Sequence, residues 1–333
     1  MNQNIIYTQN HLKNKLQRIF HYGDRPWFVL LTIMALITLA LILAIGWMLW
    51  NNSNLARQIG PTFFLPTFDA SWNPALDKYQ AWPFIYGTII TSIMAMFIAV
   101  PFSLGIAIFL AELSPDWLQQ PLSWMIELLA AIPSVVYGLW GIFTFLPVFI
   151  VPLGNLIAST LGQVPGLDIF FKGPIPASGS SRFAAGLILA IMIIPTITAV
   201  TRDVFKAIPS SQREASFALG ATRWETIWKV LIPYGLSGIL GATILGLGRA
   251  LGETMAVTMV IGNSIEGSLS LLRPGYTMSS VIANQFAEAV GPLHTSSLVY
   301  IGLILFFMTL FINSIARFLV WRVSSRLPQE ARQ

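Results

Sequence analysis

The sequence contains no cysteine and few charged residues. Only 10% of its 333 residues are charged, whereas soluble domains average about 25%, and this scarcity argues against a soluble globular enzyme. The absence of cysteine excludes disulfides, thiolate metal sites, iron–sulfur clusters and cysteine nucleophiles. The three histidines, His11, His21 and His294, show no metal-ligand spacing, and we predict no metal site. No basic soluble face is present, so we predict no nucleic-acid partner.

Apolar residues are abundant instead, at 55% of the chain, and the mean hydropathy is +0.70. A bilayer core of about 30 Å needs roughly 20 apolar residues in a helix. The sequence therefore predicts an all-α integral membrane protein, with one membrane domain over 27–321 between tails at 1–26 and 322–333. The predicted spans lie at about 27–50, 84–111, 124–151, 183–200, 231–261 and 298–321. Proline and glycine near residues 147–154 leave the end of the third span ambiguous.

The placement of lysine and arginine predicts the orientation. Thirteen of them lie in the N-terminal segment, the loop between the fourth and fifth spans, and the C-terminal end, against five in the opposite loops. Because short cytoplasmic loops carry the excess of basic residues, we expect both termini in the cytoplasm. The first apolar run is too long for a cleaved signal, and we expect a retained anchor. Glu112 and Glu127 lie at predicted cytoplasmic span ends, where we expect them to reach water.

The loop between the fourth and fifth spans reads PSSQREASFALGATRWETIWKVLIP. Ser211 and Glu214 have the spacing of a capping box at a helix start, and Thr222 and Glu225 have the same spacing. Gly220, between them, is placed to end the first helix in a left-handed conformation. The loop thus predicts two short helices joined by a tight turn. They either lie on the lipid headgroups or dock in a groove of a cytoplasmic partner.

This loop resembles the one that defines permease subunits of binding-protein-dependent ABC importers. The family pattern is Glu-Ala-Ala, three residues, Gly, nine residues, then Ile-x-Leu-Pro. The chain has Glu214, Ala215, Ser216, then Gly220, and ends with Val-Leu-Ile and Pro233, so Ser216 and the Val and Ile positions depart from the pattern. The resemblance implies a six-span ABC type I importer transmembrane domain. It also implies that the two short helices are coupling helices that contact an ATP-hydrolysing subunit.

The fifth predicted span contains a charged pair within GLGRALGETMAVTMVIGN. Arg249 and Glu253 are four residues apart, so on a continuous helix they share one face and can pair, with Arg249 within one turn of the span's midpoint. A charge there costs about 2.5–3.5 kcal/mol. The pair either joins two helices statically or marks a substrate path, where a guanidinium suits an oxyanion. Gly248 and Gly252 have the spacing of a close helix contact.

Three further segments resemble the phosphate-specific, PstC-type branch of the importer permeases over roughly 84–320. They are the Arg-Ala-Leu-Gly-Glu-Thr-Met-Ala-Val run from Arg249, the Pro-Ser-Val-Val-Tyr-Gly-Leu-Trp run from Pro133, and the GT…P pattern from Gly87 to Pro101. The resemblance implies a bacterial inner-membrane complex with the homologous permease PstA, two copies of the ATPase PstB and the periplasmic phosphate-binding protein PstS. The chain itself would need no cofactor, because ATP would be bound by the partner.

We therefore predict one half of the translocation path of an ATP-driven phosphate importer, with Arg249 and Glu253 on the path. Alternatives are a permease for phosphonate, sulfate or molybdate, and an ATP-independent secondary transporter. The chain has no phosphate-binding loop, no Gly-x-Ser-x-Gly and no His-Glu-x-x-His, the signatures of nucleotide binding and hydrolysis. We therefore predict a non-catalytic subunit, and the lack of a nucleophile–base pair in the predicted spans disfavours an intramembrane enzyme.

Overall fold

The computed structural model describes residues 25–66, 72–265 and 268–324. The chain forms two units, Met1–Asn52 and Ser53–Gln333. Within the described residues, six helical stretches are long and apolar enough to cross a membrane, which confirms the predicted all-α membrane fold and the number of spans. They are Trp27–Asn52, Trp82–Leu113, Ser134–Gln163, Arg182–Ala207, Arg223–Gly252 and Pro292–Arg322.

The described part of the first unit is a single helix, α2 (Arg25–Asn52). Its side chains are apolar on every face, and large ones such as Leu31, Leu43 and Trp47 are each more than half exposed. A helix that is apolar all round needs an apolar surrounding, so α2 has the composition of a helix surrounded by lipid. The predicted N-terminal tail lies outside the described residues as far as residue 24.

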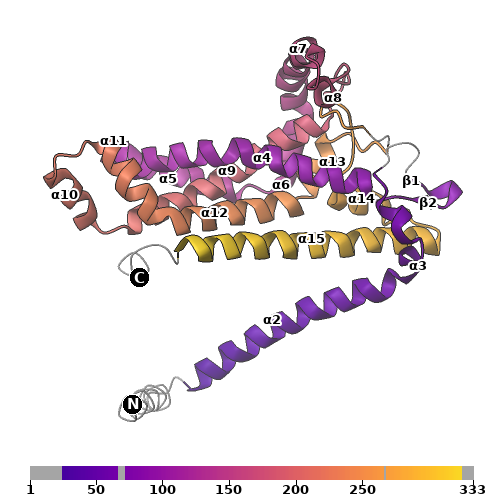
Figure 1. Ribbon diagram of the computed structural model, residues 1–333, viewed down its shortest axis with the longest axis horizontal. Helices are drawn as coiled ribbons and strands as arrows, with labels where there is room; N and C mark the ends of the chain where they lie inside the picture. Colours follow the sequence, from indigo (N-terminus) through magenta and orange to yellow (C-terminus); the bar gives the residue numbers. More distant parts are fainter. Residues whose placement is uncertain (1–24, 67–71, 266–267, 325–333) are drawn as a thin grey trace. The chain divides into compact units, whose positions relative to one another are not determined.

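Four long helices of the second unit run alongside one another (Figure 1). They are α4 (Trp82–Ile108), α9 (Arg182–Ala207), α12 (Ile232–Gly252) and α15 (Pro292–Ser324). Helix α9 is the most deeply buried of the candidate spans; it packs along α4 and against α12, and α12 also packs against α15. This arrangement makes α9 the central helix of the unit.

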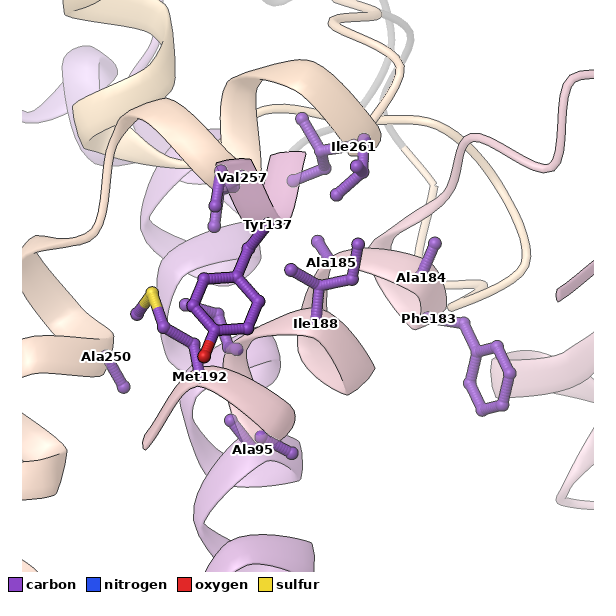
Figure 2. Packing of buried hydrophobic residues seen from close by; sticks show 14 of the residues in the cluster. Ala95, Tyr137, Phe183, Ala184, Ala185, Ile188, Met192, Ala250, Val257 and Ile261 are labelled. Carbon is purple, nitrogen blue, oxygen red and sulfur yellow. The ribbon is translucent and has the colours of Figure 1, made fainter. Parts of the chain in front are cut away.

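The main core lies where two short helices, α6 (Ser134–Trp140) and α13 (Met255–Val260), meet α9. Tyr137 of α6, Met192 of α9 and Val257 of α13 belong to this cluster (Figure 2). The Tyr137 hydroxyl donates a hydrogen bond to the carbonyl of Leu129 at 2.8 Å. The Leu129 carbonyl lies near the end of the preceding helix. The bond therefore connects two helices across a short non-helical segment.

The third predicted span, 124–151, has the wrong limits, because this non-helical segment interrupts it. Helix α5 (Asp116–Ala131) ends before Pro133, with Ile132 in an extended conformation. Proline disfavours the helical conformation of the residue before it, so the chain starts a new helical run at Ser134. That run reaches Gln163 through α6, the π-helical η4 (Gly141–Ile150), α7 (Val151–Thr160) and η5 (Leu161–Gln163). Helix α5 packs against α9 instead of forming part of the span.

The fifth predicted span, 231–261, also has other limits. The helical run begins with α11 (Arg223–Thr226), continues through the π-helical η6 (Ile227–Leu231) and ends with α12 at Gly252. Glu253 is extended, with ψ 127°, and its carboxylate accepts a hydrogen bond from the backbone N–H of Ala256 at 3.1 Å. The span therefore ends at Gly252, and Met255–Val260 form the separate helix α13.

Shorter elements lie at the two ends of the second unit (Figure 1). One end holds α10 (Ser210–Ala218) and α11. The other holds the antiparallel pair β1 (Trp72–Asn73) and β2 (Lys78–Tyr79). The remaining elements are α3 (Asn54–Arg57), η1 (Gly60–Phe64), η2 (Pro74–Leu76), η3 (Phe109–Leu113), α8 (Asp168–Phe171) and α14 (Met278–Gln285).

Candidate coupling and substrate-path sites

The loop between the fourth and fifth spans folds as a helical hairpin, which we call the coupling hairpin (residues 210–231). The predicted capping box of Ser211 and Glu214 is wrong. Helix α10 starts at Ser210, and its N-cap is Pro209, which makes no side-chain capping bond. Because the helix begins two residues earlier than expected, Ser211 lies inside its first turn and cannot be the cap.

The turn at Gly220 is as predicted. Gly220 has φ +82°, a left-handed conformation that glycine adopts without steric cost. Its N–H donates to the carbonyl of Phe217 at 2.9 Å, and the N–H of Ala221 donates to the carbonyl of Ser216 at 3.2 Å. These two bonds form a Schellman motif, so the turn satisfies the last carbonyls of α10.

The second helix starts with the predicted capping box. The N–H of Glu225 donates to the Thr222 hydroxyl at 3.3 Å, and the N–H of Thr222 donates to the Glu225 carboxylate at 3.0 Å. A buried hydrogen bond of 2.9 Å between the hydroxyls of Ser216 and Thr226 joins the two helices. Ser216 stands where the family pattern has alanine, so this departure supplies a contact that alanine cannot make.

The outer face of the hairpin carries exposed apolar side chains. Leu219 is 89% exposed, Trp224 58% and Phe217 45%, and Glu214 and Ala215 of the family pattern are exposed beside them. An exposed apolar surface rimmed by polar residues marks a contact with another protein or with a membrane. Pro233 is exposed in the first turn of α12; because proline has no backbone N–H, the preceding turn is free to widen into the π-helical η6.

Arg249 lies in the last turn of α12 and is partly buried. Its Nη1 donates a hydrogen bond of 2.8 Å to the Thr196 hydroxyl of α9. Among the described residues, no carboxylate forms an ion pair with Arg249 within 4.0 Å. The C-terminal end of a helix favours a cation, so α12 stabilises the guanidinium while its positive charge stays without a carboxylate.

Glu253 lies apart from this arrangement, and the predicted pairing with Arg249 on one helix face is wrong. The helix ends at Gly252, so the two residues no longer share a face. The Glu253 carboxylate caps the first turn of α13, and the Glu253 carbonyl accepts a hydrogen bond from the Ser279 hydroxyl of α14 at 2.8 Å. The static ion pair considered from the sequence is therefore not formed, and Arg249 is also closer to a helix end than expected.

The glycines that bring α12 close to a neighbour are not the predicted ones. A Cβ on Gly252 would meet no atom within 4 Å, and one on Gly248 would only reach Asn313 at 3.9 Å. A Cβ on Gly238 would instead lie 2.5 Å from Val204, and one on Gly246 would lie 2.5 Å from Ile197. Both contacts are with α9, so α12 packs most closely on that helix.

Sequence reasoning missed two ion pairs at the hairpin end of the unit. Glu112 pairs with Arg213 at 2.7 Å and keeps 14% exposure, so it reaches water only in part. Glu127 pairs with the buried Arg202 at 2.8 Å but keeps 53% exposure, in keeping with a boundary position. The available signal was that acidic and basic residues gather at the same predicted span ends, but nothing in the sequence selects the partners.

Residues 103–327 match the family described as "binding-protein-dependent transport system inner membrane component". The chain belongs to this family. The fold agrees with this assignment, because the permease also resembles a solved bacterial alginate ABC transporter in complex with an alginate-pentasaccharide-bound periplasmic protein. The TM-score is 0.59 at 15% identity, over 92% of this permease and 98% of that chain. Such a likeness concerns the fold alone, that of an ABC type I importer transmembrane domain.

Two curated relatives are similar in sequence. The phosphate transport system permease protein PstC of Haemophilus influenzae is 45% identical over 296 residues, which is 89% of this permease and 90% of the relative. The PstC protein of Mesorhizobium japonicum is 50% identical over 256 residues, which is 77% of this permease and 78% of the relative. The similarity therefore extends well beyond the coupling hairpin and covers most of the membrane-spanning part.

Proposed function

We propose that this permease forms one half of the translocation path of an ATP-driven phosphate importer. The observation that carries the proposal is Arg249, a partly exposed guanidinium in the fifth candidate span, with no carboxylate within ion-pair distance among the described residues. A cation in a membrane-spanning segment is costly and marks a substrate path more often than a structural contact. The PstC relatives are named as phosphate transport permeases, and this supports phosphate as the anion.

The coupling hairpin supports the part of the proposal that concerns ATP, because it offers a surface for contact with a cytoplasmic ATPase. Its exposed Phe217, Leu219 and Trp224 offer a compact apolar surface on a short, well-capped turn. Amphipathic helices with such a surface commonly dock in the groove of a partner protein. We assign Glu214, Ala215, Ser216, Gly220 and Pro233 to this coupling element.

The partners follow from the same assignment. PstA supplies the other half of the path, two copies of PstB bind and hydrolyse ATP, and PstS delivers phosphate from the periplasm. The subunit is then non-catalytic and needs no cofactor. The excess of basic residues in the hairpin loop and at both ends of the chain supports a cytoplasmic position for them, in a bacterial inner membrane.

Transport by the reconstituted complex tests whether Arg249 lies on the substrate path. The complex with PstA, PstB and PstS is placed in liposomes, and labelled phosphate uptake is measured beside ATP hydrolysis. Arg249→Gln removes the cation but keeps a polar side chain, so uptake should fall by roughly tenfold or more while hydrolysis persists. Arg317→Gln, which removes an exposed cation of α15, serves as the control. Unimpaired uptake by Arg249→Gln would contradict the proposal.

The same preparation distinguishes the anions. A guanidinium binds any tetrahedral oxyanion through paired hydrogen bonds, so the Arg249 site alone does not select phosphate. Excess sulfate, molybdate or phosphonate should leave labelled phosphate uptake unchanged if the importer is a phosphate system. Competition by one of these anions would assign the permease to that anion. Uptake without ATP or PstB would instead indicate a secondary transporter.

A further inference from the structure

Arg213 of the coupling hairpin bonds to two other helices through every nitrogen of its guanidinium. Nη2 lies 2.7 Å from the Glu112 carboxylate, and Nε lies 3.2 Å from both carboxylate oxygens. Nη1 donates to the carbonyl of Ile208 at 2.7 Å, and Nη2 also donates to the carbonyl of Phe205 at 2.7 Å. Arg213 and Glu112 are 101 residues apart, so the contact is purely tertiary.

The contacts of Arg213 fall on the ends of two helical runs. Phe205 and Ile208 lie in the last turn and at the C-cap of α9, where backbone carbonyls have no partner within the helix. Glu112 lies in η3, the π-helical turn that ends the helical run of α4. A cation is favoured at such C-terminal ends, so Arg213 satisfies the carbonyls of α9 and binds α4 with the same guanidinium.

The apolar layer beside this pair joins the same elements. It contains Ala107 and Ile108 of α4, Phe205 and Ile208 of α9, Ile227 and Leu231 of η6, and Ile239 of α12. The hairpin leads into α12 through the continuous helical run Arg223–Gly252. Arg213 adds a direct polar connection from α10 to η3, at the end of the α4 run, which the chain does not provide at that point. Helix α9 is already joined to α10 through Ile208 and Pro209.

We propose that the Arg213–Glu112 pair transmits movement of the coupling hairpin to α4 and α9, so that these helices move together with α12 as one body. The proposal rests on the proposed function, in which the hairpin contacts an ATPase. Its consequence concerns the anion site, because Arg249 lies on α12 and its partner Thr196 lies on α9. If α12 moved alone, the 2.8 Å bond between them would break; joint movement preserves it. Arg213 and Glu112 are therefore positioning residues and do not contact the substrate.

Two variants test the transmission. Glu112→Gln keeps the shape of the side chain but removes its charge. Arg213→Lys keeps the charge but loses the planar fork whose three nitrogens bond to the carboxylate and both carbonyls. In liposomes with PstA, PstB and PstS, we expect both variants to retain PstB binding and ATP hydrolysis. The phosphate transported per ATP hydrolysed should fall by roughly fivefold or more, because uncoupled hydrolysis continues. Lys206→Gln, which removes an exposed cation from the last turn of α9, should leave this ratio unchanged.

Other outcomes would contradict either the transmission role or the proposed function. An unchanged ratio in both variants would overturn the transmission role, as would loss of PstB binding in parallel with transport, since the pair would then only support docking. A parent complex that transports no phosphate with ATP would refute the proposed function itself. The two failures are distinguishable because the first requires an active parent complex.

A distance measurement tests the rigid connection independently of transport. The chain has no cysteine, so spin labels can be placed at Lys206→Cys on α9 and Ala218→Cys on α10, both exposed positions. With cysteine-free partners, the distance between the labels should be the same with and without a non-hydrolysable ATP analogue. The same labels in Glu112→Gln should show a nucleotide-dependent or broadened distance. A nucleotide-dependent distance in the parent would overturn the proposal.

Discussion

Arg249 donates a hydrogen bond of 2.8 Å to the Thr196 hydroxyl, so a neutral group of α9 holds the cation of α12, and none of the described carboxylates forms an ion pair with it. Glu253, four residues further along the chain, caps α13 instead. A neutral partner orients a guanidinium without cancelling its charge. In the proposed importer, this arrangement leaves Arg249 able to attract an anion and, because one hydroxyl is a weak competitor, able to exchange it.

Thr196→Val should weaken phosphate transport without disturbing assembly. The change keeps the branched shape and removes the hydroxyl that orients Arg249. A hydrogen bond to a charged group contributes about 1.5–3 kcal/mol, and the partial exposure of Arg249 reduces this, so we expect uptake to fall by roughly threefold to tenfold. Thr243→Val is the control, because the Thr243 hydroxyl bonds only the carbonyl of Ile239 in its own helix. Equal effects of the two variants would argue against an orienting role.

Gly220→Ala should impair coupling through backbone strain. The left-handed conformation at φ +82° costs a residue with a Cβ about 1–2 kcal/mol, although an added Cβ there would meet no atom within 4 Å. We expect weaker copurification of PstB and less transport per complex. Gly105→Ala is a matched control, because a Cβ at Gly105 also meets no atom within 4 Å and this glycine lies within α4. Similar loss in both variants would point to general destabilisation.

Ser216→Ala restores the residue of the family pattern and should loosen the hairpin. It removes the buried bond to Thr226, whose hydroxyl keeps its second bond to the carbonyl of Thr222. Loss of one such bond costs about 0.5–1.5 kcal/mol. Amide hydrogen exchange in 210–226 should therefore quicken, while Ser314→Ala on α15 should leave it unchanged. Unaltered exchange in Ser216→Ala would mean that packing alone holds α10 and α11 together.

Gly238→Ala should destabilise the contact between α12 and α9. The new Cβ would lie 2.5 Å from Cγ2 of Val204, and overpacking of this kind costs about 1–3 kcal/mol. The midpoint of thermal unfolding in detergent should fall. Adding Val204→Ala removes the clashing methyl groups and should restore part of the loss. No recovery in the double variant would place the cost of Gly238→Ala elsewhere.

The features of the coupling hairpin that the sequence predicts correctly depend on short-range interactions. Gly220 and the capping box of Thr222 and Glu225 were recognisable because each depends on residues within five positions of one another. The wrong prediction at Ser211 has the same local origin, since Pro209 is the N-cap and the helix starts two residues earlier. The helix ends near Pro133 and Glu253 were harder to predict from the sequence. Proline and charged residues occur both within long helices and at their ends, and the packing of neighbouring helices decides which of the two is formed.

The sequence by itself determined the membrane class, the six spans and the tight turn of the hairpin, because run length, apolar composition and short-range capping are properties of contiguous residues. Only the tertiary structure decided that Arg249 bonds Thr196, that Glu112 bonds Arg213 and that α12 packs on α9 through Gly238 and Gly246. These partners are separated by tens of residues or more, and several candidates of suitable charge or size lie near each. Which of them meet depends on how the helices pack, and that information is absent from any short stretch of the chain.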